Sequence, residues 1–577
     1  MEEINENRPR LHKLIIKNFR SIGKTPVEIE LDEIVVLVGP NNVGKSSILR
    51  AYEVVMSEGS KNCELSIDDF PNGIVNPESL PEIELHTIVY DNSPGEKWID
   101  NSSGEKLVKE CWTWTEPGKP KRKGYNVLEE CWDETSVPWG APNVANSRRP
   151  QAHRVDAFSD PQKQSEAMVK LISSILNDRV KSIKATPGEE NEFSKLLESI
   201  KLIQHNIIRE SQEEINKAQD GISDIIKNVF PNYKVIFDAR PEDDLEKTIN
   251  LFKAGSKLLM GPEHGYQSTI DRQGSGARRT LLWAALKYIS ETSSTGDRPH
   301  VLLLDEPELC LHPNAVREAC QVLYDLPKQS NWQVMVTTHS PAFIDVSRDN
   351  TTIIRVERNS ENEIEGTTVF RPSKVQLDDD DKRRLKLLNL CDPHVAEFFF
   401  GGFPIIVEGD TEYTALKHVI EESETPYRNI HIIRARGKAT IVSLVKILNQ
   451  FGSRFSVLHD SDYPRLASGS RNSAWTINQS ILDEINNHSD PSKIRLIASM
   501  KNFEAAFFAN EVTNDKPYNA LMQLSTESEA FKNVDTLLKS LINHQEPTPS
   551  GSLEWDNLET LERNYSEWIT EKSQFEL

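Results

Sequence analysis

One short motif constrains this chain more than any other feature of it. Residues 39–46 are Gly-Pro-Asn-Asn-Val-Gly-Lys-Ser, which matches the pattern G-x-x-x-x-G-K-[ST]. The motif follows a continuous apolar run, Ile34 to Val38, and precedes a helical pattern, so it lies between a buried strand and a helix. Glycines in this position let backbone N–H groups close around phosphate oxygens. The sequence therefore predicts a loop that binds ATP together with Mg²⁺.

The side chains and the backbone of this loop have different expected roles. We expect Lys45 to contact the β- and γ-phosphates and Ser46 to ligate Mg²⁺. The other predicted nucleotide contacts come from the loop and the first helical turn, at Gly39, Asn41, Asn42, Val43, Gly44 and Ser47.

A second acidic motif supplies the other half of such a site. The apolar run Val301 to Leu304 ends in Asp305 and Glu306, which places two adjacent carboxylates at the end of a buried strand. We expect Asp305 to hold the Mg²⁺ ion and Glu306 to orient and deprotonate the attacking water. Acidic pairs are common at strand ends, but this one follows a phosphate loop, and the two together predict ATP hydrolysis.

Three further segments resemble the ABC-type ATPase heads of SMC and RecF proteins. Residues 273–279 (QGSGARR) resemble their signature motif, residues 311–313 (LHP) their D-loop region, and residues 337–341 (TTHSP) the segment with their switch histidine, here His339. The resemblance implies that Ser275, in the signature of one protomer, caps the ATP of another. It therefore implies a homodimer through the heads.

A second group of acidic residues follows two later apolar runs. Glu408 and Glu412 come after the run PIIV, and Asp460 and Asp462 come after the run FSVL and a histidine. The carboxyl ends of parallel strands meet at one edge of a sheet, so we expect these side chains to converge there. Carboxylates that converge repel one another unless divalent cations lie among them. The sequence therefore predicts a site for one or two Mg²⁺ ions, with Mn²⁺ as a substitute.

The order of these carboxylates resembles that of the TOPRIM domain of topoisomerases, DnaG-type primases, RecR and OLD nucleases, as does the glycine-bearing segment RARGK at residues 434–438. The resemblance implies that Glu504, in the segment KNFEAAFF, is a further metal ligand. An SMC/RecF-like ATPase followed by a TOPRIM domain in one chain resembles the OLD (overcoming lysogenisation defect) endonucleases. This family includes the Gabija-type and retron-associated anti-phage nucleases.

The resemblance to the OLD family implies a function and partners. It implies an ATP-regulated, Mg²⁺-dependent DNA endonuclease, in which metal-activated water attacks the phosphodiester. The implied catalytic residues are Glu408, Glu412, Asp460 and Asp462, with Glu306 in the ATPase. The same resemblance implies an anti-phage role, a homodimer or higher oligomer, and a regulatory protein or nucleic acid as partner.

Other functions fit parts of the same pattern. An ATPase of the RecF or SMC kind that binds DNA as a non-cleaving scaffold would not need the complete acidic set. A topoisomerase needs a nucleophilic tyrosine. Tyr413 and Tyr463 lie near the acidic motifs, but topoisomerase tyrosines come from a separate domain, for which the sequence offers no candidate. A third alternative is an effector that a partner keeps inactive.

The patterns together predict an α/β protein with four segments. Residues 57–150 are rich in strand and loop signals, and residues 378–381, four aspartates, are typical of a solvated face or a hinge. The predicted segments are the N-terminal lobe of an ABC-type ATPase head (1–155), a helical arm or dimerisation insertion (156–232), the C-terminal lobe of the head (233–395) and a Rossmann-like TOPRIM domain (396–577).

Charge and hydropathy limit the partners and the location. The 577-residue chain has 67 Lys and Arg against 89 Asp and Glu, a net charge of −22, which rules out a uniformly basic surface for nucleic acid. DNA must then bind through short basic segments, such as 119–123, 278–279 and 434–438, and through metal ions. No apolar stretch approaches the roughly 20 residues of a membrane span, and the acidic N-terminus lacks the apolar region of a signal peptide. We therefore expect a cytoplasmic protein with no membrane contact.

Overall fold

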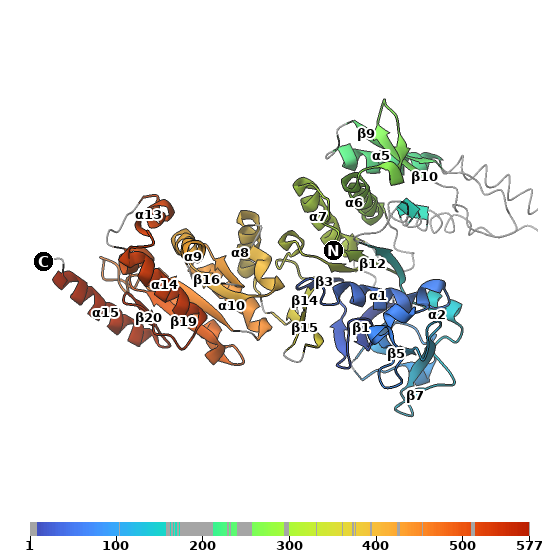
Figure 1. Cartoon of the computed structure of the whole chain (residues 1–577), viewed down its shortest axis with the longest axis horizontal. Helices are drawn as coiled ribbons and strands as arrows, with labels where there is room; N and C mark the ends of the chain where they lie inside the picture. The colour runs from blue at the N-terminus through green and yellow to red at the C-terminus, as the bar shows by residue number, and fades with distance from the viewer. Residues whose placement is uncertain are drawn as a thin grey trace, which may run out of the picture. The chain divides into compact units, whose positions relative to one another are not determined.

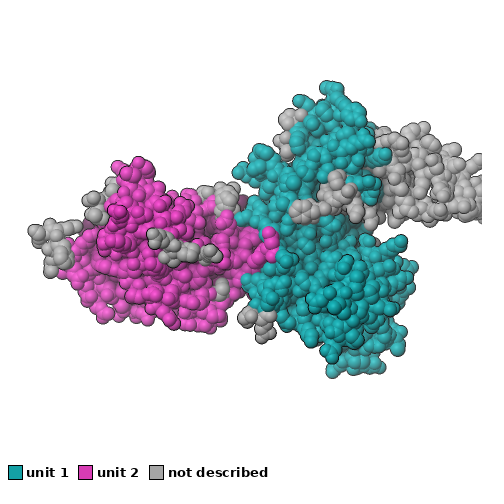
Figure 2. All heavy atoms as spheres, viewed as in Figure 1, with its two compact units in different colours: residues 1–37, 42–343, 356–366 teal, residues 38–41, 344–355, 367–577 magenta. Residues whose placement is uncertain are grey.

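The architecture comes from a computed structural model of the whole chain, which divides into two compact units (Figure 2). Unit 1 comprises residues 1–37, 42–343 and 356–366, and unit 2 comprises residues 38–41, 344–355 and 367–577. The structure describes residues 9–156 without 103, scattered positions between 162 and 173, 212–238 without 228, 229 and 231, 257–292, and 299–575 without 330–331, 360–361, 372–373, 376, 393–394, 424–426, 428, 453 and 509–513.

An antiparallel sheet forms one part of unit 1. Its strand order is β2-β1-β4-β5-β6-β7. The strands are β1 (Arg10–Lys17), β2 (Val27–Glu30), β4 (Glu82–Val89), β5 (Lys106–Thr113), β6 (Lys121–Asn126) and β7 (Cys131–Asp133). Burial alternates along β2 and β6, as expected of strands with one face on a core. The prediction of strands and loops between residues 57 and 150 is confirmed.

A second, six-stranded sheet carries the phosphate loop. Its order is β15-β14-β3-β13-β12-β8, and the pairs β3/β13, β13/β12 and β12/β8 are parallel. Its strands are β3 (Ile34–Val38), β8 (Gln151–Val155), β12 (His300–Asp305), β13 (Trp332–Thr337), β14 (Thr351–Arg358) and β15 (Ile364–Phe370). All five residues of β3 are buried, as the apolar run predicts.

The described part of unit 1 also contains helices, which alternate with strands along the chain (Figure 1). They are α1 (Lys45–Met56), α2 (Pro142–Arg148), α5 (Gln212–Lys227), α6 (Ser275–Thr292) and α7 (Pro313–Gln329). A small sheet, in the order β11-β10-β9, consists of β9 (Tyr233–Asp238), β10 (Lys257–Pro262) and β11 (Ser268–Thr269). Of the predicted helical arm, α5 is present, and most of residues 157–211 lie outside the described residues.

Unit 2 is built around a five-stranded sheet in the order β17-β16-β18-β19-β20. Its strands are β16 (Phe403–Val407), β17 (Ile430–Arg434), β18 (Phe455–Asp460), β19 (Ile494–Ser499) and β20 (Ser552–Glu554). The first four run parallel, and β20 is antiparallel to β19. The predicted Rossmann-like alternation of strands and helices is confirmed.

The helices of unit 2 pack in two groups (Figure 1). Helix α9 (Asp410–Glu422) packs with α13 (Lys516–Gln523) and α14 (Glu529–Ile542), and α10 (Lys438–Leu448) packs with α8 (Asp379–Cys391) and α11 (Ser473–Asn486). The two remaining helices are α12 (Phe503–Phe507) and α15 (Leu558–Phe575). The first turn of α9 follows the carboxyl end of β16 after only two residues, Glu408 and Gly409. Within the described ranges, no helix has the length and hydrophobicity that a membrane span requires.

Three of the four aspartates at residues 378–381 are exposed, as expected of a solvated face, and the fourth, Asp381, is buried. Asp378 caps α8, and Asp381 is only 2% exposed. Asp381 accepts hydrogen bonds from Ser443 Oγ (2.5 Å) and Lys446 Nζ (2.6 Å), both on α10. Burial raises the pKa of Asp381, but these donors outweigh that effect and hold it below the ordinary value. The run therefore starts a helix and fastens it to α10, a tertiary contact that charge patterning does not reveal.

Candidate active sites

The phosphate loop has the backbone conformation that the motif predicts. Gly39 and Gly44 have φ angles of 133° and 91°, which side-chain-bearing residues rarely adopt. A Cβ atom at Gly44 would also lie 3.0 Å from Ser21 Oγ and 3.1 Å from Ile364 Cδ1. Lys45 opens α1 and is only 5% exposed; burial lowers the pKa of its ammonium, and the charges of Glu306 and Asp305 oppose that shift. This conformation suits a loop that binds phosphate.

The predicted Mg²⁺ ligands of the ATPase meet in the structure. Asp305, at the end of β12, accepts hydrogen bonds from Ser46 Oγ (3.1 Å) and Thr337 Oγ1 (2.6 Å). Thr337 ends the neighbouring strand β13 in register with Asp305. The sequence analysis assigned Thr337 no role, although its place at the end of an adjacent parallel strand is a usable signal. A serine hydroxyl and a carboxylate that meet beside a phosphate loop fit a Mg²⁺–nucleotide complex.

The predicted general base and switch histidine also lie together. Glu306 Oε1 is 3.4 Å from His339 Nε2. Glu306 has a φ of 43°, and its N–H donates to Thr337 Oγ1 at 3.1 Å, which directs its side chain toward His339. Burial, and secondarily the charge of Lys45, hold the pKa of His339 below its ordinary value. A neutral histidine beside Glu306 is suited to share a hydrogen bond with an attacking water.

Glu308 is a functional candidate that the sequence analysis missed. Its Oε1 atom accepts a hydrogen bond from the backbone N–H of His339 at 2.7 Å. Its Oε2 atom is buried and has no hydrogen-bond partner in the part of the chain that the structure describes, and burial raises the pKa of this carboxyl. Glu308 therefore fastens the loop after β12 to the segment that carries His339. In the sequence, the only signal for this role is that Glu308 is the third acidic residue of the run DEPE at residues 305–308.

The signature segment begins helix α6 and lies against the loop that follows β12. Arg279 is 4% exposed, and its Nη1 donates to the carbonyl oxygen of Glu306 at 3.2 Å. A Cβ atom at Gly276 would lie 2.8 Å from the carbonyl oxygen of Cys310, so the close approach of α6 needs glycine there. Ser275 is exposed at the first residue of α6. Arg278, 8% exposed, and Arg279 are buried, so the expectation that they contact DNA is wrong.

The second acidic group lies at the carboxyl edge of the sheet in unit 2. Glu408 follows β16, and one of its oxygens, Oε2, accepts a hydrogen bond from the N–H of Asp460 at 3.1 Å. Glu412 is buried in the first turn of α9, and Glu504 is buried in α12. Of the four carboxyls predicted to converge, Glu408, Glu412 and Asp460 lie within electrostatic range of one another, and Asp462 acts on Glu408. Glu504 acts electrostatically on Glu412 and Asp460.

Burial and mutual repulsion disfavour the ionised form of these carboxyls. Burial raises the pKa of Glu412 to about 7, and the charges of Glu408 and Glu504 add to the shift. The pKa of Asp460 is raised well above its ordinary value, first by burial and then by Glu412 and Glu408. Such a group gains free energy when a cation lies among its members.

The two remaining carboxylates, Asp462 and Glu504, form ion pairs with lysines. Asp462, with a φ of 60°, pairs with the buried Lys438, and its N–H donates to the carbonyl oxygen of Lys501 at 3.0 Å. Glu504 Oε1 lies 3.1 Å from Lys516 Nζ and accepts a hydrogen bond from Thr411 Oγ1, also at 3.1 Å. Within the described part of the chain, Asp462 and Glu504 thus form ion pairs with lysines, and the other three predicted ligands form none.

The donor chemistry of the acidic group fits a hard divalent cation. All its members supply carboxylate oxygens, which suit Mg²⁺ and Mn²⁺. The Oδ1 atom of Asp460 is buried and has no hydrogen-bond partner among the described residues, as expected of an oxygen that a metal completes. In the described ranges, no three Asp, Glu, His or Cys side chains stand close enough together to hold one ion. A metal ion held by three of these carboxyls would therefore require their side chains to rotate.

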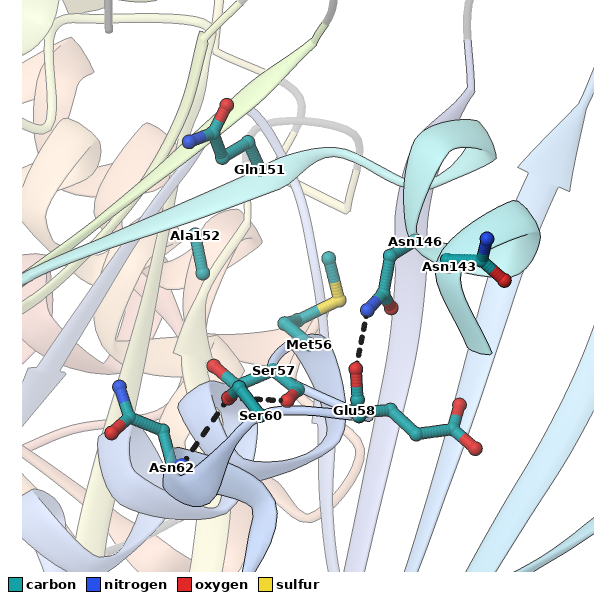
Figure 3. A pocket seen from close by; sticks show the side chains of 10 residues that line it. Met56, Ser57, Glu58, Ser60, Asn62, Asn143, Asn146, Gln151 and Ala152 are labelled. Atoms are coloured by element: carbon teal, nitrogen blue, oxygen red, sulfur yellow. Dashed lines mark hydrogen bonds between the residues drawn. The ribbon is translucent and has the colours of Figure 1, made fainter. Parts of the chain in front are cut away.

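A hollow of about 600 Å³ lies in unit 1 away from the predicted sites (Figure 3). Its walls come from the end of α1, from α2 and from the start of β8. Asn146 Nδ2 donates to the carbonyl oxygen of Glu58 there. Beside Glu58 lies a buried pair, Arg149 and Glu110, with Nη2 and Oε1 2.6 Å apart. No sequence pattern indicates this charge network, in which the loss of one partner would leave a buried charge uncompensated.

Comparisons with known proteins identify two domains in the chain. Residues 10–100 and 122–344 match the family model of an AAA ATPase domain, and residues 399–462 match the TOPRIM domain of overcoming lysogenization defect protein-like sequences. The Old nuclease of Escherichia phage P2 is 26% identical over 471 residues, which cover 79% of this chain and 77% of that protein. The OLD nuclease of Thermus scotoductus is 22% identical over 462 residues, 78% of this chain and 82% of that protein.

Among solved structures, the chain is similar to the SmcHead bound to the C-winged helix domain of ScpA, with 15% identity, a TM-score of 0.41, and coverage of 62% of this chain and 97% of that one. The family matches define the class as an ATPase domain joined to a TOPRIM domain. The ATPase model covers more than half of the chain, and the OLD-like TOPRIM domain follows it in the sequence. The chain therefore belongs to the OLD family.

Proposed function

We propose that this protein is an ATP-regulated endonuclease that cleaves DNA in the presence of Mg²⁺. The observation that carries the proposal is the group of buried carboxyls at the edge of the unit 2 sheet, with a Glu412 pKa of about 7 and an Asp460 oxygen that has no partner among the described residues. The names of the relatives, Old nuclease and OLD nuclease, support it.

Each residue of the acidic group has a proposed role in cleavage. Glu408, Glu412 and Asp460 would hold the divalent ion, and the hydrogen bond from the Asp460 N–H keeps Glu408 directed toward the site. The ion supplies Lewis-acid activation of water and of the phosphate. Glu504 and Asp462 complete the acidic wall, and their lysine partners keep the local charge from repelling DNA.

In the ATPase, we propose that Lys45 binds the phosphates while Ser46 and Asp305 hold Mg²⁺. Glu306 acts as general base and His339 shares the hydrogen bond to water. The exposure of Ser275 supports a role for the signature in a second molecule, because an exposed hydroxyl at a helix start is available to another protomer's γ-phosphate. We therefore propose a head-to-head homodimer whose ATP state regulates cleavage.

A cleavage assay tests the activity. Plasmid, linear and single-stranded DNA, and RNA, are incubated with the protein in Mg²⁺, Mn²⁺ or EDTA, with and without ATP, at fixed salt. We expect nicking or cutting of DNA with Mg²⁺ or Mn²⁺ and none in EDTA. Glu408→Ala should remove the activity, whereas Glu567→Ala, on the exposed side of α15, should not change it. Cleavage that persists in Glu408→Ala would refute the assignment.

We also propose an anti-phage role, on the strength of the OLD family alone. Cells that express the wild-type chain should resist some phages, and cells with Asp460→Ala should not. Equal plating of phage on both strains, for a broad phage panel, would contradict the role. A covalent DNA–protein adduct trapped by denaturant would instead favour a topoisomerase.

A further inference from the structure

A short basic segment follows the acidic group in the sequence. Residues 463–472, named here the hairpin loop, connect Asp462 to helix α11. The loop contains Arg465 and Arg471 and no acidic residue, whereas Asp and Glu make up 89 of the 577 residues of the chain. Both arginines are exposed, and so is Tyr463. The loop is therefore a basic and aromatic patch on a protein that is acidic as a whole.

The hairpin loop is held in shape by its own hydrogen bonds. Arg465 and Arg471 form an antiparallel bridge. The N–H of Leu466 donates to the carbonyl oxygen of Ser470 at 2.9 Å, and the N–H of Gly469 donates to the carbonyl oxygen of Leu466 at 2.8 Å. Arg465 Nη1 also donates to the carbonyl oxygen of Gly469, at 3.3 Å. An ordered loop loses less conformational entropy when it binds a partner.

The first residue of the hairpin loop, Tyr463, is fixed beside the acidic group. It directly follows Asp462, which pairs with Lys438 and acts electrostatically on Glu408. Asp462 has a φ of 60°, and its N–H donates to the carbonyl oxygen of Lys501 at 3.0 Å. The backbone before Tyr463 is thus bonded to the segment that follows β19, at the same carboxyl edge of the sheet.

The ring of Tyr463 is packed and yet open to solvent. Its centroid lies 6.4 Å from that of Tyr565 in α15, with the planes at 75°, and Tyr565 lies 5.9 Å from the fully buried Trp475. Lys501 Nζ is 5.8 Å from the centre of the Tyr463 ring. Tyr463 nevertheless remains 47% exposed. An aromatic ring held in this way is suited to stack on another flat ring.

We propose that the hairpin loop binds the DNA strand at the acidic group and that Tyr463 stacks on an unpaired base of that strand. The inference rests on the proposed nuclease function and deepens it, because it assigns the part of the substrate that this loop recognises. The exposed guanidinium of Arg471 contacts a phosphate of the same strand.

The chemistry of stacking defines the substrate that the loop favours. Every base has a π face, so stacking tolerates all sequences. A base inside an intact duplex has both faces covered by its neighbours, and its release costs free energy, which is least where the base is already unpaired. The loop therefore favours DNA with a bulged, frayed or single-stranded base. No carboxylate takes part in these contacts, so binding does not require a metal ion.

Binding in EDTA and without ATP tests the proposal. The full-length protein is titrated into a fluorescein-labelled duplex with one bulged base, and into the same duplex without the bulge, at fixed salt. We expect anisotropy to show about tenfold tighter binding of the bulged duplex. Tyr463→Ala should remove this preference, and Tyr463→Phe, which keeps the ring, should retain it. Tyr266→Ala, at an 80% exposed tyrosine of unit 1, is the control and should also retain it.

Two further measurements separate stacking from the phosphate contact. With 2-aminopurine at the bulge, emission should fall when the wild-type protein binds, because stacking quenches this base, and should not fall with Tyr463→Ala. Arg471→Ala should weaken binding of both duplexes alike and reduce the slope of log affinity against log salt by about one. A slope that Arg471→Ala leaves unchanged would contradict the phosphate contact.

Unchanged 2-aminopurine emission on binding of the wild-type protein would overturn the proposal, and that measurement decides even if Tyr463→Ala fails to fold. Equal affinity of the wild-type protein for the two duplexes, or loss of the preference in Tyr463→Phe, would overturn it as well. Any of these results together with intact Mg²⁺-dependent cleavage would refute the role of the hairpin loop alone. A protein that neither binds nor cleaves DNA would refute the nuclease function itself.

Discussion

Each of the two candidate sites contains a buried lysine. In the ATPase, Lys45 lies within range of Asp305, Glu306 and Glu308, and burial, not the carboxylates, dominates its pKa. In unit 2, Lys438 is likewise buried and within range of Glu408 and Asp460. Each site therefore keeps a compensating cation in place before any substrate binds, which reduces the reorganisation that binding requires.

The Glu308 carboxylate gives a prediction at this scale. Glu308→Ala removes the acceptor for the His339 N–H and should lower ATP turnover by about tenfold or more, because a lost hydrogen bond to a charged acceptor costs about 1.5–3 kcal/mol. Glu308→Gln keeps a carbonyl acceptor and should retain most of the turnover. Steady-state ATPase rates and nucleotide affinities separate the cases. Equal loss in both variants would show that the charge, not the hydrogen bond, matters.

The pKa of Glu412 predicts how Mg²⁺ stabilises the protein. The unfolded chain releases this proton near pH 4.5 and the folded chain near pH 7. Between these values the unfolded state binds fewer protons, so the free energy of unfolding falls as pH rises through this window. Mg²⁺ binds the ionised carboxylates and should restore the loss. Without nucleotide, Mg²⁺ should raise the Tm of unit 2 more at pH 8 than at pH 6.

Glu412→Gln is the matched control for this pH dependence. It cannot ionise, so its Tm should depend less on pH and respond less to Mg²⁺. Thermal scans in Mg²⁺ and in EDTA at both pH values measure the effect. A Mg²⁺ effect on the Tm that is the same at pH 6 and pH 8 in the wild-type protein would contradict the explanation.

At the scale of elements, both sites lie where parallel strands end. β12 and β13 bring Asp305 and Thr337 together, and β16 and β18 bring Glu408 and Asp460 together. Apolar runs followed by acidic residues are visible in the sequence, which is why these elements and this edge could be predicted. Pairs such as Asp381 with Lys446 and Asp462 with Lys438 join segments far apart in the chain. No local pattern encodes their partners, so the sequence analysis missed them.

The turn between β17 and α10 gives a prediction at this scale. Gly437 has a φ of 126° and no atom within 4 Å of a Cβ built on it, so Gly437→Ala brings backbone strain without a clash. Strain of this kind costs about 1–3 kcal/mol. Gly437→Ala should lower both the stability and DNA cleavage, because the turn positions Lys438.

Gly469 offers the matched control for this turn. It also has a positive φ, 81°, and open space at its Cβ position. Gly469→Ala should cost similar stability, measured by urea denaturation, yet leave cleavage close to wild type. Equal losses of cleavage in the two variants would show that strain, and not the position of Lys438, is responsible.

At the scale of the whole molecule, the net charge of −22 restricts DNA binding. Most of the predicted basic contacts are already engaged. Lys121 and Lys123 pair with Glu134, Arg122 is buried, and Arg434 pairs with Asp392 and Asp410. Arg436 is exposed at the turn before Lys438, with a φ of 57°. These engaged side chains leave little charge for phosphate contacts, which implies weak binding with a shallow salt dependence.

Arg436→Ala should therefore weaken DNA binding and reduce the slope of log affinity against log salt by about one. Fluorescence anisotropy with labelled duplex DNA in Ca²⁺, over a series of salt concentrations, measures both quantities. Lys532→Ala, at an exposed position of α14, is the control and should change neither. A slope that Arg436→Ala leaves unchanged would place the DNA elsewhere on the molecule.

We propose that the phosphate loop, with Lys45, Asp305 and Glu306, hydrolyses ATP and that the acidic group of unit 2 cleaves DNA. The most direct test measures both activities in Asp460→Ala. We predict that Mg²⁺-dependent cleavage of plasmid DNA falls at least about a thousandfold while ATP turnover stays within about twofold of wild type, since Asp460 lies at the acidic group and not at the phosphate loop. Cleavage that survives in Asp460→Ala would contradict the account.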